Sequence, residues 1–160
     1  NAGDISALGA TESVGVWLKE DNQTFQNHSG STVRAEGTTA IGVWVTGTDD
    51  DKVVNEGTIE AVRQTDDVVA ADTEGTGNRV AAIALDGENA DVDNKGTVRG
   101  LGTGAVGIDM QRAGGESKNA GRIEVQGVGA VGVQIDGWEP VDINGALRFI
   151  SAKYAKVVEK

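Results

Sequence analysis

The sequence predicts an all-β fold: a right-handed, single-stranded parallel β-helix (β-solenoid) of about six coils with roughly 25 residues in each. Three observations predict it. An Asn-x-Gly turn motif recurs along the chain, a second recurring block alternates like a half-buried strand, and glycine supplies 24 of the 160 residues. Glycine at this density opposes helices, since each one costs about 1 kcal/mol in a helix interior. We expect residues 1–160 to form one β-helix domain, a fragment of a longer solenoid.

The first repeated motif is Asn-x-Gly-x followed by isoleucine or valine. Its copies begin at Asn1, Asn55, Asn94 and Asn119, with degenerate copies NHSGSTV from Asn27 and INGAL from Ile143. Asparagine tolerates the left-handed backbone conformation of tight turns, and stacked side-chain amides can hydrogen-bond from coil to coil. We therefore predict that Asn1, Asn55, Asn94 and Asn119 are structural turn residues.

The second repeated block has five copies: SVGVWL (13–18), AIGVWV (40–45), VAAIAL (80–85), AVGIDM (105–110) and AVGVQI (130–135). The last three residues of each copy alternate apolar, variable and apolar, which is the period of a strand with one buried face. The glycine inside the block, Gly107 or Gly132 in the later copies, is predicted to be a structural turn residue that lets the backbone enter a crowded interior. A shorter third segment, such as KVVN (52–55), completes each coil.

Two segments, 102–107 and 127–132, match the Gly-x-Gly-x-x-Gly fingerprint of dinucleotide-binding sites. That fingerprint requires a strand before it and a helix after it, whose N-terminus faces the pyrophosphate. Here a strand is predicted to follow. The first two glycines of each segment are therefore expected to turn a corner with positive φ, and no cofactor is predicted.

Two parts of the chain depart from the repeat. About 14 extra residues lie in the third unit around 64–77, and we expect an inserted loop there. It is either a plain surface loop or a recognition loop, and Asp66 and Asp67 are its candidate partner-binding residues. Residues 146–160 contain no glycine and bring larger side chains, which suits a terminal coil or cap that closes the core, with an amphipathic helix as the alternative.

Charge excludes some classes of partner. The chain carries 25 acidic and 14 basic side chains, a formal net charge of −11, which repels nucleic acid and anionic membrane surfaces. No apolar run approaches the roughly 18–20 residues of a membrane span, so we expect no direct membrane insertion. Cysteine is absent, which excludes disulfides and thiolate chemistry.

The sequence offers no convincing catalytic or metal-binding constellation. His28 is the one histidine, and the adjacent Ser29 is a poor candidate for its nucleophile because neighbouring residues rarely pair in this way. Acidic clusters occur at 48–52, 66–67 and 91–93, but neither an EF-hand loop nor a calcium-binding nonapeptide is present. Arginines that could act with carboxylates, Arg63, Arg79 and Arg99, are scattered in the sequence. We predict no catalytic residue and no metal.

Trp17 and Trp44 occupy the same position in consecutive copies of the second block. Each lies between inward apolar neighbours, so the pleat directs both indoles outward on adjacent coils, about 4.8 Å apart at the backbone. Two stacked indoles would give a small apolar platform for a sugar ring or another protein. The alternative is that a neighbouring loop covers them.

The Asn-x-Gly-x-[Ile/Val] turn followed by Ala-[Val/Ile]-Gly-[Val/Ile], repeated over nearly the whole chain, resembles the β-helix passenger domains of Gram-negative autotransporters. More loosely, it resembles exoproteins of the filamentous haemagglutinin type. The resemblance implies secretion to the bacterial cell surface and a role in adhesion and virulence. The Gly-Asp-Ser-Gly segment of protease-bearing members does not occur.

The expected function is therefore a non-enzymatic adhesion or self-association module at the cell surface. Its expected partners are a host-surface protein, a glycan or further copies of the chain. A β-helix that degrades or binds polysaccharide, of the tailspike or pectate-lyase type, is the alternative. That chemistry would need carboxylates and a basic residue gathered on one outer face.

Overall fold

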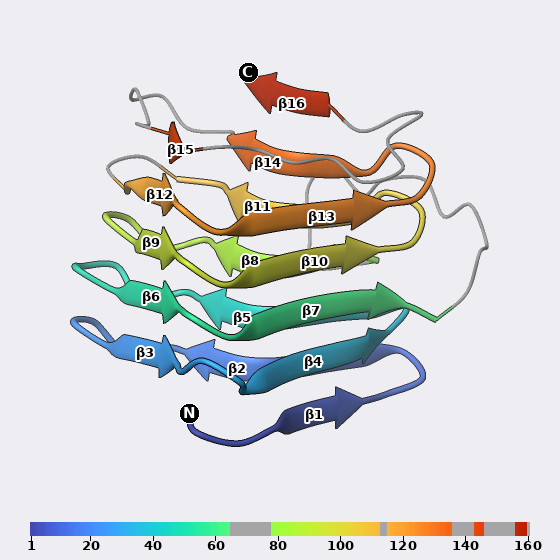
Figure 1. Cartoon of the computed structure of the whole chain (residues 1–160), viewed down its shortest axis with the longest axis horizontal. Coiled ribbons are helices and arrows are strands. Elements are labelled where there is room, and N and C mark those ends of the chain that lie inside the picture. Colours follow the sequence, from blue (N-terminus) through green and yellow to red (C-terminus); the bar gives the residue numbers. More distant parts are fainter. Residues whose placement is uncertain (65–77, 113–114, 136–142, 146–155, 160) are drawn as a thin grey trace.

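The chain forms a β-solenoid with right-handed coils, as predicted (Figure 1). The computed structural model describes residues 1–64, 78–112, 115–135, 143–145 and 156–159. Within these residues every strand pairs in parallel and no helix occurs. Each coil contributes one strand to each of three sheets, which run side by side along the solenoid axis.

The described strands form three parallel sheets, A, B and C. Sheet A consists, in spatial order, of β1 (Ile5–Leu8), β4 (Thr32–Gly37), β7 (Thr58–Arg63), β10 (Thr97–Leu101) and β13 (Arg122–Gln126). Sheet B consists of β2 (Glu12–Leu18), β5 (Thr39–Val45), β8 (Val80–Leu85), β11 (Val106–Met110), β14 (Val131–Ile135) and β16 (Lys156–Glu159). Sheet C consists of β3 (Thr24–Asn27), β6 (Lys52–Asn55), β9 (Asp91–Asn94), β12 (Ser117–Asn119) and β15 (Ile143–Gly145).

The register between coils follows the sequence repeat. The predicted anchors of the first motif lie opposite one another in sheet A, in the order Ile5, Val33, Ile59, Val98 and Ile123. The solenoid makes about four turns between β1 and β13, fewer than the six coils expected. After the fifth copy of the second block, sheet B continues with β16, which pairs with β14. Residues 156–159 therefore form a strand and not the amphipathic helix that was the alternative for this end of the chain. The rest of 146–160 and the loop residues 65–77 lie outside the described residues.

Small aliphatic side chains fill the interior between the sheets. Sheet A contributes Val33, Ile59, Val98 and Ile123, each at most 1% exposed, and sheets B and C face them with further valine, isoleucine and alanine side chains. β-Branched residues suit strands, and burying each of these side chains stabilises the fold by about 1.5–3 kcal/mol. Because the coils repeat, each side chain stacks on a similar one above and below it.

Glycines serve two different purposes. Gly102, Gly104, Gly127 and Gly129 have φ of 116°, 67°, 141° and 71°, and each Gly-x-Gly-x-x-Gly segment leads into a strand, β11 or β14. Gly107 and Gly132 lie inside the strands β11 and β14, so their predicted role as turn residues is wrong. They are required because the backbone is crowded there. A Cβ added to Gly107 would lie 2.5 Å from the carbonyl oxygen of Gly132 and 2.7 Å from a methyl group of Ile123.

The motif asparagines form a ladder along sheet C that is buried from Asn27 to Asn119 and partly exposed at Asn1. Each side-chain Nδ2 donates to the Oδ1 of the next coil, at 3.0, 2.9, 2.8 and 2.6 Å from Asn1 through Asn27, Asn55 and Asn94 to Asn119. The predicted left-handed turn conformation is wrong for these residues. The described non-glycine residues with positive φ are Asn22, Asp50, Asn78 and Asn89. Asn55, Asn94 and Asn119 instead end strands, with their side chains directed into the interior.

Candidate interaction site

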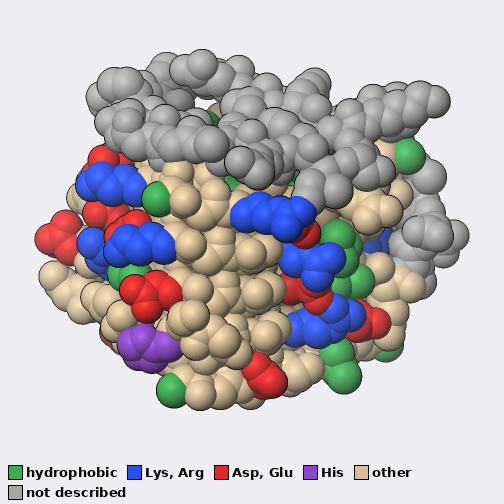
Figure 2. All heavy atoms as spheres, in the orientation of Figure 1, with side chains coloured by type: hydrophobic (Ala, Val, Ile, Leu, Met, Phe, Trp, Pro, Cys, Tyr) green, Lys and Arg blue, Asp and Glu red, His purple; other side chains and the backbone are tan. Residues whose placement is uncertain are grey.

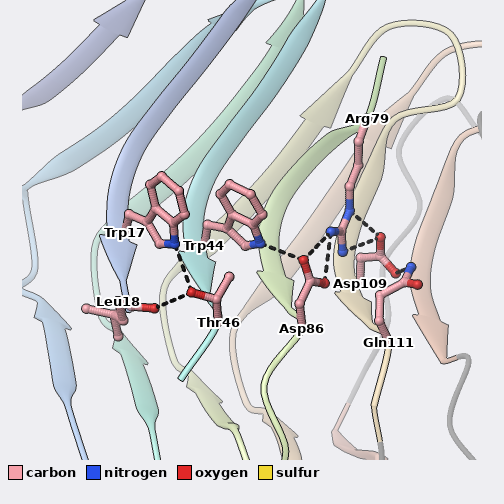
Figure 3. Close-up of polar contacts among 8 residues, drawn as sticks. All are labelled: Trp17, Leu18, Trp44, Thr46, Arg79, Asp86, Asp109 and Gln111. Atoms are coloured by element: carbon pink, nitrogen blue, oxygen red, sulfur yellow. Dashed lines mark hydrogen bonds and ion pairs between the residues drawn. The ribbon is translucent and has the colours of Figure 1, made fainter. Parts of the chain in front are cut away.

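The two tryptophans lie on the outer face of sheet B, on adjacent coils (Figure 3). Trp17 in β2 is in register with Trp44 in β5, and their rings stack with centroids 4.5 Å apart and planes inclined by 15°. The predicted register and outward direction of this pair are therefore present in the structure. Ring stacking of this kind is worth about 0.5–1.5 kcal/mol beyond the burial of the two rings.

The two indoles differ in exposure. Trp17 is 44% exposed, whereas Trp44 is only 8% exposed, so the expectation of two solvent-exposed rings is wrong for Trp44. Trp44 belongs to an apolar cluster on this outer face, together with Ile41, Ala81, Ala84, Val106 and Val131. Trp17 is consequently the ring that faces solvent, and Trp44 is its support.

Hydrogen bonds from the indole N–H groups hold both rings in place. Trp17 Nε1 donates to Thr46 Oγ1 at 2.9 Å, and that hydroxyl donates to the carbonyl oxygen of Leu18 at 3.2 Å. Trp44 Nε1 donates to Asp86 Oδ2 at 2.6 Å. A stacked pair with both N–H groups satisfied presents a rigid surface, so a partner would lose little side-chain entropy by ordering it.

A charged network continues from Asp86 to the next coil of sheet B (Figure 3). Arg79 Nη1 lies 2.8 Å from Asp86 Oδ2, while its Nε and Nη2 lie 2.8 and 2.7 Å from Asp109 Oδ2. Gln111 Nε2 donates to Asp109 Oδ1 at 3.0 Å. Both oxygens of each carboxylate are therefore bound within the protein.

The protonation of this network follows from its burial. Burial raises the pKa of Asp109, and the charge of Arg79 and the Gln111 amide reduce that rise. Burial alone would lower the pKa of Arg79, but Asp109 and Asp86 together outweigh it and raise that pKa. The guanidinium therefore stays charged between the two aspartates.

The repeat pattern does not indicate this network because its members are far apart in the chain. Arg79 precedes β8, Asp86 follows it, and Asp109 lies one coil further in β11. The signal that could have found them is the repeat register itself, since Asp109 is in register with Ala84 and Ala84 with Trp44. Two carboxylates and Arg79 do gather on this outer face, although the arginines are scattered in the sequence.

A second charged array covers sheet A, where basic and acidic side chains interleave (Figure 2). Glu60 pairs with Arg34 on one side and, at 2.7 Å, with Arg99 on the other, and Arg99 lies 3.0 Å from Glu124. Further pairs join Arg34 to Glu36 and Arg122 to Glu124. Because the charges alternate, the array neutralises itself and offers no single-sign surface to a partner.

The remaining predicted residues do not converge on a site. His28 is exposed, with Nδ1 3.8 Å from Glu56 Oε2. Asp66 and Asp67 lie outside the described residues. Within the described ranges, no group of three or more histidines and carboxylates is arranged to hold a metal ion. In the same part of the chain, no helix has the length and apolar character to span a membrane.

No model of a known protein family matches this chain, and neither a curated protein nor a solved structure matches it. The site must therefore be interpreted from its own geometry.

Removal of Arg79 tests whether the network is structural. Arg79→Ala leaves two aspartates close together without their cation, and we expect the free energy of unfolding to fall by about 2 kcal/mol at pH 7. This is below the roughly 3–5 kcal/mol of a fully buried pair because the Arg79 side chain is partly exposed. Without Arg79 the folded pKa of Asp109 rises further, so the loss is present above that pKa and shrinks as the pH falls through it.

Urea unfolding of Arg79→Ala and wild type at pH 7 and pH 5 measures this difference, with Arg79→Lys as the charge-conserving control. A loss of equal size at both pH values would show that Arg79 acts through packing and not through its charge.

Proposed function

We propose that this chain is a non-enzymatic interaction module of an autotransporter-like secreted protein, acting in adhesion or self-association at the bacterial cell surface. The observation that supports this most directly is the exposed indole of Trp17, backed by Trp44 and fixed by the Thr46 hydroxyl. Exposed, rigid aromatic side chains are the commonest energetic centres of binding surfaces. A partner protein, a glycan or another copy of the chain could use this surface.

The alternative function, cleavage of polysaccharide, would rest on Asp86, Asp109 and Arg79. A glycoside hydrolase needs one carboxylic acid and one carboxylate free to reach the scissile bond. Asp109 is only 3% exposed, and both aspartates are engaged by Arg79, Trp44 or Gln111. The geometry of these residues suits a network that orients Trp44 better than a catalytic pair. Release of reducing sugars from acidic polysaccharides would favour the alternative.

Substitution of Trp17 tests the proposed contact. Trp17→Ala should weaken binding to partners found in a screen of glycans, matrix proteins and the chain itself by about 1–3 kcal/mol, as at aromatic hot spots. Its free energy of unfolding should fall by only about 0.5–1.5 kcal/mol, because the ring is half exposed and mainly loses its stacking on Trp44. Trp44→Ala is expected to weaken binding and lower stability together, since Trp44 is buried in the outer cluster.

The matched control is Leu8→Ala, which removes another exposed apolar side chain from the first coil, but from sheet A. Leu8→Ala should leave partner binding unchanged. Equal binding by wild type, Trp17→Ala and Leu8→Ala would rule out Trp17 as the contact.

A further inference from the structure

An ammonium group of the chain itself already occupies the solvent side of Trp17. Lys19 Nζ lies 3.6 Å from the centroid of the Trp17 ring, well within the roughly 6 Å of a cation–π contact. Trp44 stacks on Trp17, and Thr46 fixes the indole N–H. The ring is therefore held in a position where its negative π-face meets a cation.

Acidic residues gather in the turns that directly follow β2, the strand of Trp17, and β5, the strand of Trp44. Glu20 and Asp21 in the first turn and Asp49 and Asp50 in the second are all exposed. The two turns are bonded together, because the backbone N–H and hydroxyl of Thr48 donate to Asp21 Oδ1 at 2.6 and 3.0 Å. Both hydrogen bonds lower the pKa of Asp21, and the one from the backbone N–H of Thr48 has the larger effect. The carboxylate of Asp21 is therefore charged at neutral pH.

We propose that the Trp17 face binds a lysine or arginine side chain from a basic segment of a partner protein, and that Lys19 holds this position in the free protein. The inference rests on the proposed function and names the chemistry of its partner. A neutral sugar could donate hydrogen bonds to these carboxylates but would gain no charge attraction, and an acidic polysaccharide would be repelled by them and by the net charge of −11. A cationic side chain is attracted both by the π-face of Trp17 and by the carboxylates of the turns after β2 and β5.

Lys19 is suited to giving up this position. Its side chain is exposed and flexible, so its ammonium is held weakly and can exchange with one supplied by a partner. The incoming side chain competes with Lys19, which predicts that loss of Lys19 strengthens binding. Loss of a positive charge elsewhere on the chain would strengthen partner binding only by making the net charge more negative.

The test measures binding of an octalysine peptide by calorimetry at 0.15 M salt, where exposed charges beyond about 8 Å are screened. Trp17→Ala should weaken binding about three- to tenfold, the range of exposed to partly desolvated cation–π contacts, while Leu8→Ala should not. Lys19→Gln should bind the peptide about two- to fivefold more tightly than Lys118→Gln, which removes the same charge from sheet C. Circular dichroism of each variant confirms that it is folded.

Equal octalysine affinities for Trp17→Ala and Leu8→Ala would overturn the inference, because net charge alone would then hold the peptide. Equal affinities for Lys19→Gln and Lys118→Gln would overturn the role of Lys19. If octalysine binding does not need Trp17 but binding of a glycan or of another copy does, the proposed function stands without this inference. If no ligand needs Trp17, both fail.

Discussion

Gly96→Ala should lower the free energy of unfolding by about 3 kcal/mol or more, although it adds a single methyl group. Its Cβ would lie 2.1 Å from the carbonyl oxygen of Gly57 and 2.6 Å from the carbonyl carbon of Glu56, both in the preceding coil. These are backbone atoms of a hydrogen-bonded coil, so no side-chain rotation can remove the overlap. The coils would have to move apart. Urea unfolding of the variant and wild type measures the loss.

Gly3 provides a matched control, since it is the glycine of the first Asn-x-Gly motif and has no atom within 4 Å of an added Cβ. Gly3→Ala should change stability by less than about 1 kcal/mol, in the range of Gly-to-Ala effects on the unfolded chain. Similar losses for Gly3→Ala and Gly96→Ala would mean that the backbone conformation, and not the contact between coils, requires glycine.

This contact explains the motif in a way that sequence reasoning did not. The glycine two positions after Asn1, Asn55, Asn94 and Asn119 was expected to belong to a tight turn. Gly96 and Gly121 lack positive φ, and each instead packs against the backbone of the coil before it. Absence of a side chain, and not conformational freedom, is what the position requires.

The fold was predictable because every coil repeats the same environment. A strand with one buried face has period two, and a solenoid places equivalent residues of successive coils in register. The order of Ile5, Val33, Ile59, Val98 and Ile123 in sheet A, and the pairing of Trp17 with Trp44, follow from the repeat alone.

The rest of the candidate site depends on side chains that break the repeat. Asp86 accepts a hydrogen bond from Trp44, 42 residues earlier, and Arg79 reaches Asp109, 30 residues later. At the position of Asp109 in the second block, the other coils have tryptophan, alanine or glutamine. The network therefore follows no periodic pattern that the sequence could show. The burial of Trp44 likewise depends on the side chains that pack over the outer face of sheet B. The alternation within one strand predicts the direction of the Trp44 side chain but not whether other residues cover it.

The asparagine ladder carries the second large expected effect. Asn55→Leu, which introduces an apolar side chain of similar shape, should lower the free energy of unfolding by about 4 kcal/mol. Asn55 Nδ2 donates to Asn94 Oδ1 at 2.8 Å and to the carbonyl oxygen of Thr97 at 3.1 Å, and Asn55 Oδ1 accepts from Asn27 at 2.9 Å. Each buried group deprived of its partner costs about 1–3 kcal/mol, and Asn55 is fully buried, away from solvent.

Two further variants separate hydrogen bonding from packing. Asn1→Ala removes the exposed end of the ladder and should cost less than about 1 kcal/mol, as for one solvated hydrogen bond. Asn55→Asp keeps the shape and the acceptor for Asn27, but it directs a carboxylate oxygen toward Asn94 Oδ1. Burial must raise the folded pKa of the new carboxyl above its unfolded value of about 3.9, so the instability is present above the folded pKa.

As the pH falls through that pKa, the carboxyl gains a proton that can be donated to Asn94, and the stability deficit of Asn55→Asp relative to wild type should shrink by about 1.4 kcal/mol per unit of pKa elevation. The deficit of Asn55→Leu has no titrating group and should stay constant between pH 7 and pH 4. Urea unfolding of both variants at the two pH values gives the comparison. If the stability deficit of Asn55→Asp were as independent of pH as that of Asn55→Leu, the ladder would stabilise the coils through the shape of its side chains. The hydrogen bond that residue 55 donates would then contribute little.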